Sequence, residues 1–218
     1  MAAPALLYED DDLLVVDKPA GLLSVPTPGA RGRTLLDALA ETGREVLAVH
    51  RLDREVSGCV LLARHEEARA ALDALFRERA LEKIYVAVVL GRLPKPAGDW
   101  KDPILDEGAY ARVSARGKKS VTRWKVTAQH PLAAEVEVEL VTGRYNQIRV
   151  HFAHHGHALV GDRKYGRGKD DPFRFARVAL HAARLAFAHT LRANEVRAEA
   201  PWPADLRELS AQAARRRS

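Results

Sequence analysis

Two neighbouring segments of the chain alternate polar and apolar residues, and this pattern constrains the fold more than any other feature. Residues 121–127 read Val-Thr-Arg-Trp-Lys-Val-Thr, and residues 135–140 read Glu-Val-Glu-Val-Glu-Leu. A period of two with one polar face is typical of antiparallel strands, whose side chains point alternately to the core and to water. The sequence therefore predicts antiparallel pairing in this part of the chain.

Other segments supply the remaining elements. Apolar runs predict strands over residues 13–16, 59–63, 83–90, 178–187 and 196–198. Helical spacing and end signals predict helices over residues 66–79, 147–155 and 203–217, and a further helix that Thr34 caps together with Asp37 and that Gly43 ends. Strands outnumber helices, and strand and helix do not alternate regularly. We therefore expect an α+β fold, a mixed, mainly antiparallel sheet flanked by helices and loops.

The length and composition indicate one globular domain. The 218 residues are 47% hydrophobic, and no linker rich in Pro, Gly or Ser divides them, so we predict a single domain over 1–218. The first residues lack a basic region and run into acidic residues 9–12, so we expect neither a signal peptide nor a transit peptide here. No apolar run approaches the ~20 residues of a membrane span. We expect a cytoplasmic protein with no membrane partner.

The charge balance favours a polyanionic partner. The chain has 35 Lys and Arg against 29 Asp and Glu, a net charge of +6. This excess is typical of proteins that bind nucleic acid, although basic proteins of ordinary metabolism share it. Cys59 is the only cysteine, which excludes an internal disulfide framework and a multi-cysteine zinc site.

The stretch from His50 to Gly58 is the first candidate for chemistry. It places Asp53 between Arg51 and Arg54, just before a Ser-Gly turn. A carboxylate beside a guanidinium is favoured in its ionised form, which suits a nucleophile or an electrostatic partner better than a proton donor. An ordinary ion-paired turn has the same residues, so the stretch alone leaves both interpretations open.

Two further positions are candidates on similar grounds. Residues 141–151 run from a strand end through Gly143 into a helix, where Arg149 is placed to reach a buried carboxylate and Ile148 to form an apolar wall. A solvated basic turn is the alternative for this segment. Tyr85 lies in the middle of a predicted strand, where it either packs in the core or offers a stacking face to a planar base.

Four histidines stand close together, at positions 151, 154, 155 and 157. His151 and His155 are four apart, the spacing at which two side chains of a helix can share a ligand. A hydrolytic zinc site would need a third strong ligand and an acid between them, and the sequence has neither there. We therefore predict no metal site, and favour phosphate binding or helix capping for these side chains.

Five motifs together resemble the RluA-type family of RNA pseudouridine synthases, and the resemblance covers nearly the whole chain. The residues that carry it are Leu7-Tyr8-Glu9-Asp10-Asp11-Asp12-Leu13 with Val16-Asp17-Lys18-Pro19-Ala20-Gly21; His50-Arg51-Leu52-Asp53 with Ser57-Gly58; Lys83-Ile84-Tyr85-Val86-Ala87; Gly143-Arg144 with Gln147-Ile148-Arg149-Val150-His151, Gly156-His157, Val160-Gly161-Asp162 and Tyr165-Gly166; and Leu180-His181-Ala182 with Leu185 and Phe187.

The resemblance implies roles for single residues. Asp53 is expected to be the catalytic aspartate, Tyr85 the ring that stacks on the target base, and Arg149 the partner of the aspartate. Ile148 would pack beside that pair, and Arg51 would enter the space that a flipped uridine leaves. The substrate-binding residues are then Arg51, Ile148, Arg144, Gln147 and His151.

The implied function is isomerisation of uridine to pseudouridine in structured rRNA or tRNA after base flipping. The resemblance implies RNA as the partner. We expect a monomer that needs no cofactor and no metal, since the sequence has no nucleotide-binding glycine loop, metal cluster or redox pair. The family's S4-type RNA-binding module is expected to be absent, because the first motif begins within ten residues of the start. Basic residues are predicted to hold phosphates: Arg31, Arg33, Arg112, Arg116, Lys118 and Lys119. The alternatives are a non-catalytic RNA-binding or RNA-folding protein and a metal-dependent hydrolase.

The chain departs from the family's usual residues at three places. Val56 stands where the family usually has Thr, Tyr145-Asn146 where it has Thr-His, and Thr190 where it has Pro. None of these replaces the aspartate, the tyrosine or the arginine. Val56 removes a hydroxyl from the catalytic turn but keeps its size, and Tyr145-Asn146 changes the contacts around the segment that leads to Arg149.

Overall fold

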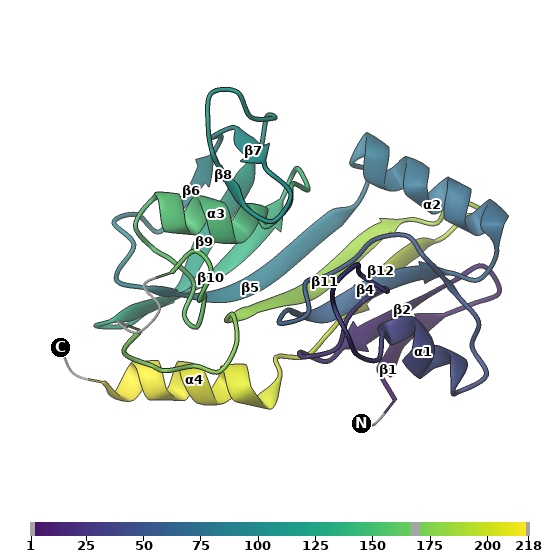
Figure 1. Ribbon diagram of the computed structural model, residues 1–218, viewed down its shortest axis with the longest axis horizontal. Helices are drawn as coiled ribbons and strands as arrows, with labels where there is room; N and C mark the ends of the chain where they lie inside the picture. The colour runs from purple at the N-terminus through teal and green to yellow at the C-terminus, as the bar shows by residue number, and fades with distance from the viewer. Residues whose placement is uncertain (1–2, 167–170, 217–218) are drawn as a thin grey trace. The chain divides into compact units, whose positions relative to one another are not determined.

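The computed structural model describes residues 3–166 and 171–216, and the chain forms two compact units. Unit 1 consists of Met1–Lys83 and Ala182–Pro201, and unit 2 consists of Ile84–His181 and Trp202–Ser218. Each unit is therefore built from two separate stretches of the chain. Figure 1 labels the elements of both. One domain over 1–218 stays a prediction.

Unit 1 is a sheet with two helices. Its strand order is β1-β2-β4-β11-β12, β3 pairs with the end of β4, and the pairs β1–β2, β2–β4, β3–β4 and β11–β12 are antiparallel. The strands are β1 (Ala5–Glu9), β2 (Leu13–Lys18), β3 (Leu47–Ala48), β4 (Ser57–Ala63), β11 (Leu180–Ala188) and β12 (Glu195–Glu199), and the helices are α1 (Leu35–Ala40) and α2 (Glu66–Glu78).

The ends of the helices in unit 1 follow local rules. Thr34 accepts a hydrogen bond from the backbone of Asp37, and the Asp37 side chain accepts one from Thr34, so the predicted cap of α1 is confirmed. Helix α2 ends where Arg79 takes the left-handed conformation, with φ of 60°. The predicted helix over 66–79 is thus confirmed, with Arg79 as its cap rather than its last residue.

The core of unit 1 lies between α2 and the sheet. Leu72 of α2 packs in one apolar cluster with Leu61 of β4 and Phe187 of β11. Cys59 belongs to the same cluster, and burial raises the pKa of its thiol to about 12. The thiol is therefore a packing group and has little of the thiolate that reactive cysteines need.

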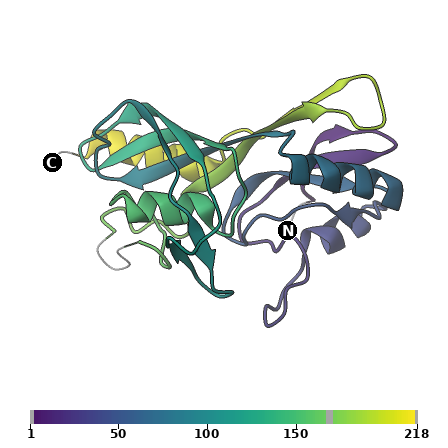
Figure 2. The same cartoon turned by 90° about the horizontal axis from the view of Figure 1, so that it is seen from above.

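Unit 2 is built on a four-strand antiparallel sheet in the order β5-β10-β9-β6. Helices α3 and α4 cover opposite faces of it, and strands β7 and β8 form a separate hairpin (Figures 1 and 2). The elements are β5 (Glu82–Leu90), β6 (Ala97–Trp100), β7 (Ile104–Asp106), β8 (Ala111–Val113), β9 (Thr122–Gln129), β10 (Ala133–Leu140), α3 (Gln147–His154) and α4 (Ala204–Arg215).

The two alternating segments pair as predicted, but part of their polar face is covered by protein rather than by solvent. Val136 and Val138 of β10 are buried, as the pattern requires. On the other face, Glu135 accepts hydrogen bonds from His130 and from Ser210 of α4 and keeps 13% of its side chain exposed. Helix α4 therefore covers one end of the face that the pattern assigned to water.

The predicted elements are confirmed in type and place, and the α+β prediction with them, but helix α1 ends at Ala40 with Glu41 as its cap rather than at Gly43. Residue 217, the last one predicted for the terminal helix, lies outside the described residues. The helix over 147–155 differs in one respect, because it was expected to be apolar on one side only. Residues 147–152 of α3 are all buried, including Gln147, Arg149 and His151. Strands β1, β3, β6, β7 and β8 were not predicted. Within the described ranges, no helix has the length and apolar character that crossing a bilayer requires.

Candidate active site

The loop between β3 and β4 carries Arg51 and Asp53, and the segment that follows β2 fixes its backbone. The hydroxyl of Ser24 donates to the Leu52 carbonyl (2.8 Å) and accepts from the Leu52 N–H (3.0 Å). The Asp53 carbonyl accepts from the N–H of Val56 at 3.1 Å. Asp53 is half-buried and Arg51 is exposed. Hydrogen bonds therefore fix the backbone of the residue before Asp53 and that of Asp53 itself.

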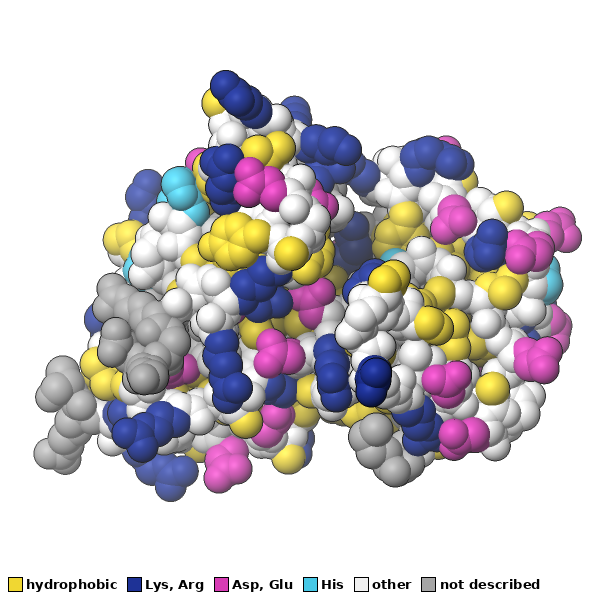
Figure 3. All heavy atoms as spheres, viewed as in Figure 1, with side chains coloured by type: hydrophobic (Ala, Val, Ile, Leu, Met, Phe, Trp, Pro, Cys, Tyr) yellow, Lys and Arg dark blue, Asp and Glu magenta, His cyan; other side chains and the backbone are white. Residues whose placement is uncertain are grey.

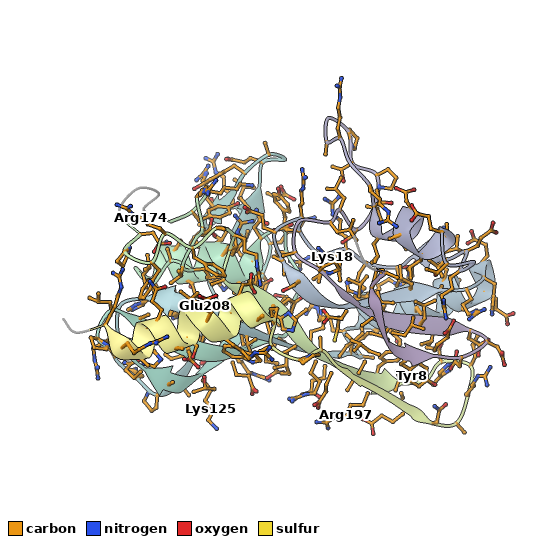
Figure 4. The ribbon with its side chains drawn as sticks, turned by 90° about the horizontal axis from the view of Figure 1, so that it is seen from below. Tyr8, Lys18, Lys125, Arg174, Arg197 and Glu208 are labelled. Carbon is orange, nitrogen blue, oxygen red and sulfur yellow. The ribbon has the colours of Figure 1, made fainter. Side chains whose placement is uncertain are left out.

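A fully buried lysine supports the same loop. Lys18, at the end of β2 (Figure 4), donates from Nζ to the carbonyls of Leu22 (2.8 Å), Pro19 (3.0 Å) and Arg54 (3.4 Å). The Arg54 carbonyl also accepts from the N–H of Gly21 at 2.7 Å. One cation therefore joins the turn after β2 to the residue that follows Asp53. The sequence indicated only a turn at residues 17–21.

Gly58 lets β4 approach β11 closely at the end of the loop. Its φ is +112°, and a Cβ at this position would lie 2.2 Å from the Ala182 carbonyl oxygen. No side chain fits in that space, so the glycine of the motif has a steric cause. The predicted Ser-Gly turn is wrong, because Ser57 and Gly58 are the first two residues of β4 and the turn lies at residues 54–55.

His50, at the start of the loop, is half-buried and favoured in its neutral form. Its Nε2 accepts a hydrogen bond from the N–H of Leu61 (2.9 Å), which places the ring proton on Nδ1. Its ring contacts that of Phe76, with 4.8 Å between centroids. Burial, together with the charge of Lys83, lowers the pKa of His50 to about 4. His50 thus anchors the loop to β4 only while it is unprotonated.

Unit 2 carries Tyr85 and Arg149. Tyr85 is a half-buried residue of β5 opposite Val138 of β10. Arg149 is 6% exposed and donates to both oxygens of Asp162, from Nε at 2.8 Å and from Nη2 at 2.9 Å. Oδ1 of Asp162 also accepts the backbone N–H groups of Lys164 (2.9 Å) and Tyr165 (3.0 Å). This carboxylate therefore sets the orientation of the arginine.

Gln147, the first residue of α3, joins the start of β9 to the segment that leads into the helix. Its amide nitrogen donates to the Val121 carbonyl (3.0 Å) and the Thr122 hydroxyl (2.9 Å). Its amide oxygen accepts from the Thr142 hydroxyl (2.8 Å) and from the backbone of Arg144 (3.0 Å). Both ends of the side chain are thus engaged inside unit 2.

Ile148 and His151 are buried in the same helix. His151 has no exposed surface; its ring nitrogens lie 2.8 Å from the Thr122 hydroxyl and 2.9 Å from the Asp102 carbonyl. Burial lowers the pKa of His151, so the neutral ring is favoured. These bonds hold α3 to β9. A contribution of Gln147, Ile148 or His151 to substrate binding stays a prediction.

Among the described residues, two groups of side chains have the donor atoms to hold a metal ion: Asp102, His154 and His155, and Asp10, Asp12 and His189. In each group a histidine is already bonded to a carboxylate. His155 lies 2.8 Å from Asp102, and His189 lies 3.0 Å from Asp10. His155 also stacks on Trp100.

The predicted phosphate contacts lie in both units. Arg31 and Arg33 belong to the loop between β2 and α1, which stands out from unit 1 in Figure 2. Arg33 pairs with Glu41, and Arg112 with Glu107. Lysine and arginine side chains are spread over the face of each unit that Figure 3 shows.

The structure thus places the predicted residues in two groups. Arg51 and Asp53 lie on one loop of unit 1, whereas unit 2 holds Tyr85, Arg144, Gln147, Ile148, Arg149 and His151. A pairing of Arg149 with Asp53 joins the two groups and stays a prediction. Lys18 and Asp162 were recognised in the sequence only as members of motifs. Lys18 supports the loop of Asp53 through hydrogen bonds to three carbonyls, and Asp162 orients Arg149 through an ion pair. The spacing of the motifs did not reveal either role.

Comparison with known proteins gives consistent results. A family model described as RNA pseudouridylate synthase matches residues 12–154. The "Uncharacterized RNA pseudouridine synthase YhcT" of Bacillus subtilis is 37% identical over 216 residues, which cover 94% of this chain and 70% of the relative. The "Ribosomal large subunit pseudouridine synthase C" of Vibrio vulnificus is 34% identical over 212 residues, 94% of this chain and 67% of the relative.

A solved structure shows the same fold. "Human RNA Pseudouridylate Synthase Domain Containing 1" superposes with a TM-score of 0.78 at 25% identity and covers 93% of this chain and 86% of the human one.

Proposed function

Because the chain belongs to the RNA pseudouridylate synthase family, we propose that it converts uridines of structured RNA to pseudouridine, with Asp53 as the catalytic group. It is an RNA pseudouridine synthase of the RluA type. The observation that carries the proposal is the family match over residues 12–154, a segment that includes Asp53, Tyr85 and Arg149.

The reaction needs one well-placed carboxylate. The bond between uracil N1 and the ribose carbon breaks, the uracil turns, and its C5 joins the same ribose carbon. The C5 proton leaves and N1 takes up a proton, so the composition of the nucleotide does not change. Asp53 begins this sequence, either by attacking the ribose or by removing a ribose proton. A second carboxylate that activates water, as in many glycosidases, would release the base instead.

The loop geometry supports this role for Asp53. Lys18, Ser24 and His50 hold the backbone around the aspartate through hydrogen bonds. A preorganised carboxylate meets the substrate without losing further conformational entropy, which favours the reactive alignment. Arg149 provides the positive partner, and its own orientation is fixed by Asp162.

The uridine must leave its stack to react. Flipping costs a few kcal/mol and costs least in loops, so the target lies in a hairpin loop or another structured single-stranded site. Tyr85 recovers part of that cost by stacking on the base, on the order of 1–3 kcal/mol. Arg51, which is exposed, fills the space that the base leaves.

The names of the relatives direct the choice of RNA. Several are named ribosomal large subunit pseudouridine synthases, which supports large-subunit rRNA as a substrate. Transfer RNA is the second candidate. We propose that the enzyme acts without a cofactor, and activity that persists in a chelator would agree with this.

The test is tritium release from transcripts of these two RNAs made with uridine labelled at C5. Wild-type protein is expected to release tritium from at least one of them, and Asp53→Asn is expected to release none. Asp73→Asn removes the same charge from an exposed position of α2 and serves as the matched control.

Two results would contradict the proposal. Tritium release by Asp53→Asn at a rate near that of wild type would remove Asp53 from the mechanism. RNA binding by the wild-type protein without tritium release from either transcript would favour the non-catalytic alternative.

A further inference from the structure

Unit 2 holds three tyrosine rings around one ammonium group, here called the tyrosine–lysine cluster: Tyr110, Tyr145, Tyr165 and Lys164. Nζ of Lys164 lies 4.7 Å from the centroid of Tyr145, 5.2 Å from that of Tyr165 and 5.7 Å from that of Tyr110. It also donates to the Tyr145 hydroxyl at 3.2 Å. All three distances are within the range of cation–π attraction, so one cation holds the three rings together.

Tyr165 is half-buried and forms the base of the cluster. Its hydroxyl accepts from the backbone N–H of Ala111 (3.1 Å) and from the Asn146 side chain (3.0 Å). Its ring packs against the small apolar cluster of Ile104, Ala111 and Val150. These contacts fix the start of β8 and the N-terminus of α3 relative to each other, and with them the positions of Tyr110 and Tyr145.

The other two rings face solvent. Tyr110 is 43% exposed and Tyr145 is 37% exposed. Single exposed apolar residues are ordinary, but two aromatic rings that share one cation form a patch. Figure 3 shows hydrophobic side chains beside basic ones on unit 2, over the region of α3 and β8. Packing within the fold accounts for Tyr165 and leaves the exposure of the other two rings unexplained.

The cation of the cluster is stabilised where it lies. Partial burial works against the charge of Lys164, but the hydrogen bond with Tyr145 and the electrostatic attraction of the Tyr145 and Tyr165 side chains outweigh burial, so its pKa is raised. The patch therefore carries a positive charge throughout the physiological range.

We propose that Tyr110, Lys164 and Tyr145 bind an unpaired base of the substrate RNA other than the uridine that is isomerised. The base stacks on the exposed tyrosine rings, and Lys164 contacts the adjacent phosphate. Every base has a π face, and stacking on aromatic side chains beside a cation is a recurrent mode of single-strand recognition. The inference rests on the proposed function, since the ligand is part of the same RNA.

The cluster shares its framework with Arg149. Asp162, which binds the guanidinium, also accepts the backbone N–H groups of Lys164 and Tyr165. The guanidinium lies 5.3 Å from the Tyr165 ring centroid. A base held on this cluster therefore rests on the segment that orients a catalytic arginine, which favours RNA over an unrelated ligand.

The binding experiment uses the full chain and a fluorescein-labelled oligouridylate of twelve nucleotides that contains one 2-aminopurine. Tyr110→Leu and Tyr145→Leu remove a ring and keep apolar bulk, whereas Tyr110→Phe and Tyr145→Phe keep the ring. Each Leu variant is expected to weaken the Kd on the order of tenfold and to reduce the quenching of 2-aminopurine. Each Phe variant is expected to stay within about twofold of wild type.

Charge is tested separately. Lys164→Met is expected to reduce the slope of log Kd against log salt by about 0.7, the value for one phosphate contact of a single strand. Lys95→Met removes the same charge from an exposed loop and should leave the slope unchanged. Leu191→Ala removes apolar surface from another exposed position, 40% exposed, and should leave the Kd unchanged.

The outcomes separate this inference from the proposed function. Leu variants that bind like wild type, or Phe variants that weaken binding as much as Leu variants, would overturn the tyrosine–lysine cluster as a stacking site even if tritium is released. Ring-dependent binding with no tritium release from rRNA or tRNA would overturn the proposed function and support the stacking site.

Discussion

Arg149 and Asp162 form a bidentate ion pair, with 2.8 Å from Nε to one carboxylate oxygen and 2.9 Å from Nη2 to the other, and both side chains are shielded from solvent. Two parallel hydrogen bonds fix the plane of a guanidinium as well as its position. The arginine that is proposed to pair with the catalytic aspartate thus has its orientation set within unit 2.

Asp162→Asn is expected to destabilise the protein by about 3–5 kcal/mol, because it leaves the Arg149 charge buried with a neutral neighbour. Urea unfolding measures the loss, and the exposed Asp73→Asn should change stability by less than about 0.5 kcal/mol. The double variant Arg149→Met/Asp162→Leu should recover part of the stability and none of the tritium release. A free energy of unfolding equal to that of wild type in Asp162→Asn would show that the ion pair does not contribute to stability.

Tyr85→Phe is expected to bind RNA as wild type does and to release tritium more slowly. The ring that stacks on the base survives this change, whereas the hydroxyl is lost. Binding is measured by fluorescence anisotropy and the rate by single-turnover tritium release. Unchanged turnover would argue against a catalytic role of the hydroxyl, and Tyr85→Leu, which removes the ring, should weaken binding.

Lys18→Met is expected to reduce both stability and rate. The variant leaves the carbonyls of Pro19, Leu22 and Arg54 without their buried donor, which costs about 1–3 kcal/mol and loosens the loop that carries Asp53. Urea unfolding measures the stability, and tritium release at a temperature where the variant is folded measures the rate. Lys95→Met is the control. A loss of stability without a loss of rate would show that Lys18 does not position Asp53 for the reaction.

His50 predicts a dependence of stability on pH. The unfolded chain takes up the His50 proton near its ordinary pKa of about 6.5, whereas the folded chain takes it up only near about 4. Between these values the unfolded state binds more protons, so the His50 contribution decreases as the pH falls from about 6.5 to about 4. The loss approaches about 3 kcal/mol in the limit of complete burial.

The variant His50→Gln isolates this effect. Glutamine keeps an acceptor for the N–H of Leu61 but does not titrate. Urea unfolding between pH 4 and pH 7 is expected to show a steeper loss of stability in wild type than in the variant. Equal slopes would show that the folded protein accepts a proton on His50 as easily as the unfolded chain does.

Gly58→Ala is expected to destabilise the protein by at least twice as much as Gly29→Ala. Both glycines have positive φ, +112° and +78°, so each substitution strains the backbone. Only at Gly58 would the new methyl group meet another strand, since nothing lies within 4 Å at Gly29. Thermal unfolding of the two variants compares the costs, and similar values would show that β4 and β11 can separate without penalty.

The elements with a clear period or a clear end signal were predictable. The capping residues Thr34 and Asp37 and the alternation over 135–140 each express a local rule, and the structure follows them. Strand β6 shows where such rules end. It contains Gly98, which alternation would not select, and the glycine is there because the Trp124 ring lies where a Cβ would be, at 2.8 Å. That cause lies in another strand.

The candidate site divides in the same way. The residue types around Asp53 and Arg149 could be recognised because the motifs place them in order along the chain. The partner that the structure shows for Arg149 is Asp162, thirteen residues later, and periodicity does not encode such a contact. Lys18 is similar, since a lysine before a proline reads as a surface turn until its three carbonyl partners are known.

Cys59 has a practical consequence for work on this protein. It is the only cysteine of the chain, and it is buried with its pKa raised to about 12. A maleimide should therefore leave the wild-type protein unlabelled at neutral pH. A cysteine introduced at position 110 or 145 would then be the one reactive thiol, and a photo-crosslinker attached there would identify the nucleotides that lie beside it in any RNA the protein binds.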